Sequence, residues 1–187
     1  MGQPEPASRL AAVIPELTRV LDPAYLAGIA TAPLDDIRSM RSSCADLENG
    51  ASFVRRLAQG RLDLLVEERK RRAEGAGGDL AALVDGLADT LSDGVRAAGS
   101  GRLDQELDPP DHVVGPLTDL LDARVGPGAI SGVADLDDPG LAAAVNALRD
   151  FEEELSAVRR SLHTTIDALN NELARRIAAG ESPTGLA

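Results

Sequence analysis

The chain is poor in the residues that build thick globular cores and in those that hold metal ions. Aromatic residues make up 2% of its 187 residues and tryptophan is absent, a composition that favours helices packed in pairs. Cys44 is the single cysteine, which excludes an intramolecular disulfide and suits a reducing compartment. The two histidines, His112 and His163, have no partners at metal-ligand spacing. We therefore expect neither a metal site nor catalysis, including that of a helical phosphohydrolase.

Long apolar runs and targeting signals are also missing. No run of 18 apolar residues occurs, and residues 1–6 lack the positive charge that begins a signal peptide. We therefore expect a soluble, cytoplasmic protein that makes no contact with a membrane. The net charge of −12 disfavours non-specific DNA binding, and no helix-turn-helix pattern lies beside a basic helix, so no direct DNA binding is expected. The acidic residues concentrate in 73–140, which either faces a basic protein surface or only maintains solubility.

The most informative feature that is present is a pattern of five polar residues that occurs twice. The pattern is Glu-x3-Ser-x2-Arg-x3-Gln-x3-Asp, and each residue of the second copy lies 104 positions after its counterpart. On a helix, these steps place all five side chains in a stripe about 80° wide and about 22 Å long, which is enough to line a dinucleotide. The first copy is Glu48, Ser52, Arg55, Gln59 and Asp63, and the second is Glu152, Ser156, Arg159, His163 and Asp167.

The repeat extends well beyond this motif. A shift of 104 positions superimposes residues 21–72 on residues 125–176 without a gap. We interpret the match as an internal duplication of a loop and a long helix, which predicts a pair of helices related by a pseudo-two-fold axis. Matching residues outside the motif include Pro23 and Pro127, Gly28 and Gly132, Arg56 and Arg160, and Glu68, Arg71 and Arg72 with Glu172, Arg175 and Arg176.

Start and stop signals define two long helices. Pro33 with Asp35 and Asp36 indicates a helix start, and the glycines from Gly75 onward indicate its end, which predicts a helix over 34–73. Similar signals predict a second helix over 139–179. Helices of about 40 residues are typical of coiled coils, and apolar residues recur here at heptad spacing. They are Ile37, Met40, Cys44, Leu47, Ala51, Val54 and Ala58 in the first, and Leu141, Ala144, Leu148, Phe151, Leu155, Val158 and Leu162 in the second.

Both heptad patterns break at the same place. The next position is polar (Arg61 and Thr165), and an apolar residue follows one position later (Leu62 and Ile166). The fold class we predict is all-α: a long antiparallel coiled coil of two duplicated helices, with shorter helices in the connecting acidic segment. We divide the chain into a loop or short helix over 1–33, the helix 34–73, the acidic connection 74–138, the helix 139–179 and a flexible tail over 180–187. Within the connection we expect helices near 79–97 and 113–123, with a loop over 124–140.

The polar stripe has two chemical interpretations. An arginine can pair with a guanine edge or a phosphate, and carboxylates can accept hydrogen bonds from the N–H groups of guanine. Two like faces related by a two-fold axis would suit a two-fold-symmetric ligand such as a cyclic dinucleotide. The alternative is a ladder of solvated ion pairs beside the coiled-coil seam, in a structural adaptor without a ligand.

The duplicated motif resembles the signature of the RsiG family, cyclic-di-GMP-dependent anti-sigma factors of actinobacteria that bind the sporulation sigma factor WhiG. The resemblance implies a non-catalytic clamp in which two cyclic-di-GMP molecules contact the ten motif residues. The loaded coiled coil would hold a WhiG-like sigma factor away from RNA polymerase. His163 departs from the family's pattern because it replaces a glutamine. Histidine can still donate or accept one hydrogen bond, and its contact can depend on pH.

Overall fold

The computed structural model describes residue 10, residues 12–75 and residues 109–181. The helix expected near 79–97 and most of the expected tail lie outside the described residues. Contacts group the chain into two compact units, and both long helices pass from one unit into the other. The first unit holds the described residues within Met1–Arg55, Pro109–Asp119 and Glu153–Ala187, and the second holds those within Arg56–Asp108 and Leu120–Glu152.

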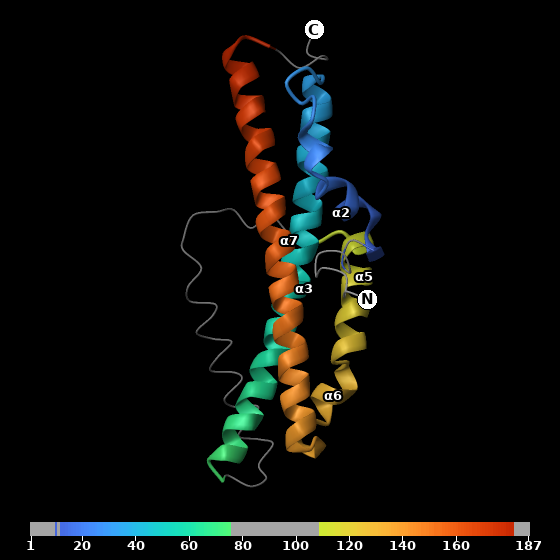
Figure 1. Ribbon diagram of the computed structural model, residues 1–187, viewed down its shortest axis with the longest axis vertical. Helices are drawn as coiled ribbons and strands as arrows, with labels where there is room; N and C mark the ends of the chain where they lie inside the picture. Colours follow the sequence, from blue (N-terminus) through green and yellow to red (C-terminus); the bar gives the residue numbers. More distant parts are fainter. Residues whose placement is uncertain (1–9, 11, 76–108, 182–187) are drawn as a thin grey trace. The chain divides into compact units, whose positions relative to one another are not determined.

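The two long helices, α3 and α7, have the lengths that their end signals indicate. Helix α3 spans Leu34–Ala73 and α7 spans Asp138–Ala178, within one residue of the predicted ranges (Figure 1). The Asp137 carboxylate accepts a hydrogen bond from the Gly140 amide at 2.9 Å, which caps the first turn of α7. Gly75 and Gly180 follow the two helices with φ angles of 69° and 88°, a conformation that only glycine adopts without strain.

The first unit pairs the N-terminal part of α3 with the C-terminal part of α7. The two run antiparallel, because Arg41 lies against Asn170 and Glu48, further along α3, lies against the earlier residue Arg159. Helix α2 (Pro15–Val20), the short helix η1 (Pro23–Leu26) and the first part of α5 (Asp111–Arg124) complete this unit (Figure 1).

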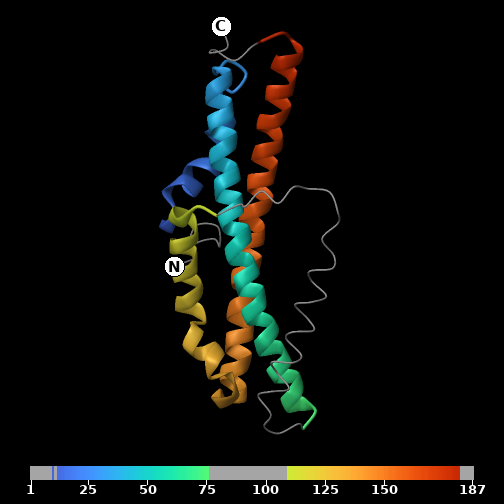
Figure 2. The same ribbon diagram turned by 180° about the vertical axis from the view of Figure 1, so that it is seen from behind.

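The second unit pairs the remainder of the two helices, again antiparallel. Gln59 lies against Glu152, and Arg72 lies against Asp138. This unit also holds the end of α5, α6 (Pro127–Ser131) and η2 (Val133–Asp135). The prediction of a loop over 124–140 is therefore wrong in part, since Pro127 begins a short helix there. Across the described residues every regular element is helical, which confirms the predicted all-α fold with its antiparallel coiled coil (Figures 1 and 2).

The predicted seam forms the core of each unit. Twelve of the fourteen predicted seam residues are buried, while Met40 and Ala144 are partly exposed. Each buried leucine contributes about 1.5–3 kcal/mol relative to an exposed one. The polar residues Arg61 and Thr165 do not move the buried seam one position on, to Leu62 and Ile166, which are only partly buried. Thr165 stays buried and donates its hydroxyl to the Ser161 carbonyl at 3.1 Å, while Leu65 and Leu169 continue the seam, each with 0% exposure.

Partly buried glutamate–arginine clusters extend the seam at matching positions in the two copies. In the second unit, Arg72 donates to Glu68 at 2.7 Å and to the Val133 carbonyl at 3.1 Å. In the first unit, Arg176 donates to Glu172 at 2.9 Å and to the Ile29 carbonyl at 2.9 Å. Ile29 and Val133 are counterparts in the duplication. Arg72 of α3 therefore binds the loop that precedes α7, and Arg176 of α7 binds the loop that precedes α3. An antiparallel pair of duplicated helices requires this exchange.

These clusters perturb the acidity of their glutamates. Hydrogen bonds from Arg71 and Arg72 outweigh burial and lower the pKa of Glu68 to about 2. Hydrogen bonds from Arg175 and Arg176 likewise lower the pKa of Glu172 to about 2. Both carboxylates are therefore ionised throughout the neutral range.

Among the described residues, no helix combines the length and the apolar character that a bilayer crossing requires.

Candidate functional site

In the first unit, motif residues of both copies meet around Glu48. Its Oε1 accepts hydrogen bonds from the Ser52 hydroxyl at 2.7 Å and from Nε of Arg159 at 2.9 Å. Arg159 Nη2 lies 2.8 Å from the same oxygen, and His163 Nε2 lies 3.3 Å from it. The structure thus joins two residues of the first motif copy to two residues of the second.

The Glu48 carboxylate is held in its ionised form. Burial alone would raise its pKa, but the hydrogen bonds from Ser52 and Arg159 and the positive charge of Arg159 outweigh burial and lower the pKa. The Glu48 side chain is 14% exposed, whereas that of His163 is 55% exposed. The charged centre of this cluster is therefore largely shielded from solvent, with an imidazole at its open edge.

In the second unit, the equivalent contact occurs with the copies exchanged. Gln59 Nε2 donates to Glu152 Oε1 at 2.8 Å. Gln59 is the counterpart of His163, and Glu152 is the counterpart of Glu48. In each unit, therefore, the fourth motif residue of one copy reaches the motif glutamate of the other copy.

The remaining motif residues differ in exposure. Arg55 and Ser156 are partly exposed, and the two aspartates, Asp63 and Asp167, are exposed. Each motif copy therefore runs from a shielded glutamate to an aspartate in contact with solvent. Such a stripe offers cationic donors and anionic acceptors together, which suits a ligand that carries both phosphates and the N–H-rich edge of a guanine.

Helix α5 lies on the other side of α3 from the motif. A side chain on Gly50 would meet Val113 of α5, with the added Cβ 2.5 Å from Cγ1. Two helical steps separate Gly50 from Glu48, or about 200° around the axis. The packing of α5 in this unit therefore does not obstruct the side of α3 that carries Glu48 and Ser52.

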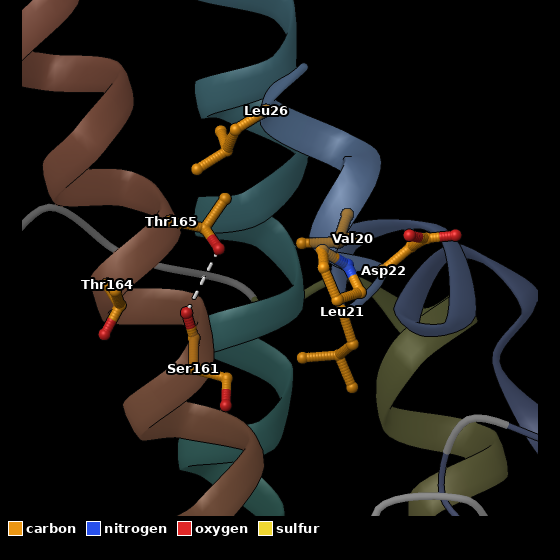
Figure 3. Close-up of a pocket in the computed structure, with 8 residues that line it drawn as sticks. Val20, Leu21, Asp22, Leu26, Ser161, Thr164 and Thr165 are labelled. Carbon is orange, nitrogen blue, oxygen red and sulfur yellow. Dashed lines mark hydrogen bonds between the residues drawn. The ribbon is translucent and has the colours of Figure 1, made fainter.

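A cavity of about 240 Å³ lies elsewhere in the first unit and contains no motif residue (Figure 3). Its volume is below the range of about 300–1,000 Å³ that small-molecule pockets commonly have. The hydroxyls of Thr164 and Thr165 donate to carbonyls of their own helix, so they are already engaged. The lining residues are Val20, Leu21, Asp22, Pro23, Leu26, Ser161, Thr164 and Thr165.

Comparison with known protein families identifies the chain. A family model described as RsiG-like matches residues 23–91 and 127–186, more than half of the sequence. The chain belongs to the RsiG-like family. The two matched stretches begin at Pro23 and Pro127, which are counterparts in the duplication. No curated protein and no solved structure matches the chain. Membership of the RsiG-like family points to an anti-sigma factor, with a sigma factor as the kind of partner.

Sequence reasoning chose the ten motif residues but did not predict how they pair. Ion pairs along a single helix were the expected alternative to a ligand site. The structure contains an intrahelical hydrogen bond between Ser52 and Glu48, but the ion pair of Glu48 crosses to Arg159 on the other helix. The antiparallel register of α3 and α7 brings Glu48 and Arg159 together. Residue spacing within one helix does not determine that register.

Proposed function

We propose that the chain is a cyclic-di-GMP-binding anti-sigma factor that acts without catalysis. In its loaded form it holds a sporulation or flagellar-type sigma factor, similar to WhiG, away from RNA polymerase. Membership of the RsiG-like family supports the anti-sigma role. The ten motif residues, with their guanidinium, carboxylate and amide groups, support the nucleotide as ligand.

The observation that carries this proposal is the contact between motif copies in each unit. Glu48 with Arg159 in the first unit, and Glu152 with Gln59 in the second, give two clusters of related composition. Two clusters of this kind favour two cyclic-di-GMP molecules. An incoming nucleotide competes with the contact between Glu48 and Arg159, so its binding is coupled to the arrangement of the two helices at that point.

The coupling must be reciprocal. If nucleotide binding favours the shape that grips the sigma factor, the sigma factor must raise the affinity for nucleotide by the same factor. The rival function, a coiled-coil adaptor without a ligand, predicts no such coupling.

Co-purification of the full chain with a flagellar-type sigma factor, with and without cyclic-di-GMP, tests the proposal. We expect capture of the sigma factor only when nucleotide is present, and loss of capture in Arg159→Ala. Arg38→Ala is the matched control, because Arg38 is a partly exposed arginine of α3 that lies outside the motif. Equal capture with and without nucleotide would favour the adaptor instead.

A further inference from the structure

A sixth side chain accompanies the motif in each copy. On α7, Arg160 follows Ser156 by four residues and precedes His163 and Asp167 by three and seven. At about 100° per residue these four side chains lie within about 60° of one another, so Arg160 stands about 20° beyond the edge of the motif stripe. All four belong to the first unit.

The second unit repeats this placement on α3. There Arg56 precedes Gln59 and Asp63 by the same three and seven residues, and Arg56 is the counterpart of Arg160. Both side chains are exposed. In the part of the chain that the structure describes, neither guanidinium belongs to an ion pair.

Two other arginines provide a comparison. Arg69 and Arg149 are also exposed and also lack an ion pair within the described residues. Their counterparts in the duplication are Leu173 and Ala45, so neither positive charge is repeated. Among these four exposed arginines, only Arg56 and Arg160 occur in both copies.

The charge of the motif explains why an additional cation is needed. Each copy carries two carboxylates and one arginine, and in the first unit Arg159 is already bound to Glu48. A cyclic dinucleotide carries one negative charge on each of its two phosphodiester groups. In the second unit the motif residues include two carboxylates and no arginine, so they would repel the ligand unless Arg56 added a positive charge. In the first unit two arginines balance two carboxylates, and Arg160 supplies the net positive charge that suits the phosphates.

We infer that Arg56 and Arg160 bind the phosphodiester groups of the cyclic dinucleotide, while the motif carboxylates take the N–H groups of its bases. This inference rests on the proposed function. Arginine suits the task because its planar guanidinium can give two parallel hydrogen bonds to one phosphate.

Calorimetric titration of cyclic-di-GMP into the full chain tests the inference. We expect Arg56→Gln and Arg160→Gln each to raise the Kd of the affected site about tenfold or more, since a charged hydrogen bond is lost. In the double variant, Kd should also depend less on salt concentration, because fewer cations meet the phosphates. Arg69→Gln removes the same charge away from the motif, and we expect its Kd to stay within about twofold of the wild type.

The outcomes separate this inference from the proposed function. If the wild type binds and the double variant binds as tightly as Arg69→Gln, the phosphate role is overturned while the proposed function stands. A weaker Kd with unchanged salt dependence also overturns it. If the wild type itself gives no heat, the proposed function fails first. Arg56→Lys and Arg160→Lys keep the charge, and we expect them to recover much of the affinity and all of the salt dependence.

Discussion

Replacement of Gly50 by alanine tests how closely α5 packs on α3. The added methyl carbon would lie 2.5 Å from Cγ1 and 2.7 Å from Cβ of Val113, closer than carbon atoms can approach. Val113 is β-branched and lies in a helix, where one rotamer dominates, so it cannot turn aside. The clash can be relieved only by movement of α5 away from α3.

Two opposing effects set the magnitude. An alanine inside a helix is about 1 kcal/mol more favourable than a glycine. Overpacking of a tight contact costs about 1–3 kcal/mol. Gly60 supplies the control, because an added Cβ there would have no heavy atom within 4 Å outside its own helix neighbourhood. We therefore expect Gly60→Ala to stabilise the fold by up to about 1 kcal/mol, and Gly50→Ala to be about 1–3 kcal/mol less stable than Gly60→Ala.

Thermal unfolding followed by circular dichroism measures this difference. For a chain of this length, 1 kcal/mol shifts Tm by about 2–4 °C, so the two variants should differ by at least about 2 °C. Adding Val113→Ala to Gly50→Ala removes Cγ1 but keeps Cβ, which lies 2.7 Å from the added carbon, so it should recover only part of the loss caused by the alanine. Equal Tm values for Gly50→Ala and Gly60→Ala would show that α5 does not pack on Gly50.

The other predictions concern the motif and the seam ends. Arg55→Ala or Arg159→Ala should abolish nucleotide-dependent sigma-factor binding while the helical content stays unchanged; normal capture by either variant would mean that the arginine named is wrong. Because their pKa values are lowered to about 2, Glu68 and Glu172 stabilise the fold fully above the ordinary glutamate pKa, and this contribution is lost as the pH falls toward 2. Urea unfolding of the double Glu→Gln variant should therefore show a smaller loss of stability between about pH 5 and pH 3 than the wild type.

The long helices could be predicted from sequence because their ends and their seam carry local signals. Pro33 and the acidic residues after it define the start of α3, and Gly75 defines its end. The heptad spacing of Leu47, Ala51 and Val54 identified side chains that prove to be buried. These signals depend only on neighbours within a few turns, so they can be read along the chain.

Contacts between distant segments could not be predicted in the same way. Arg61 breaks the heptad pattern, and the structure shows it donating to the Val125 carbonyl at 2.7 Å and pairing with Asp122, also at 2.7 Å. From the sequence, Arg72 and Arg176 were identified only as matching residues of the duplication, yet both bind loop carbonyls. Such partners depend on which loop passes over which helix, and residue spacing along the sequence does not determine these contacts.

The most direct test of the central claim is a calorimetric titration of cyclic-di-GMP into the full chain, with and without a flagellar-type sigma factor. If the duplicated polar stripes form nucleotide sites, heat should be released at nucleotide concentrations of about tens of micromolar or below, and affinity should rise when the sigma factor is present. The absence of heat in both titrations would contradict this account and leave a coiled-coil adaptor as the better description.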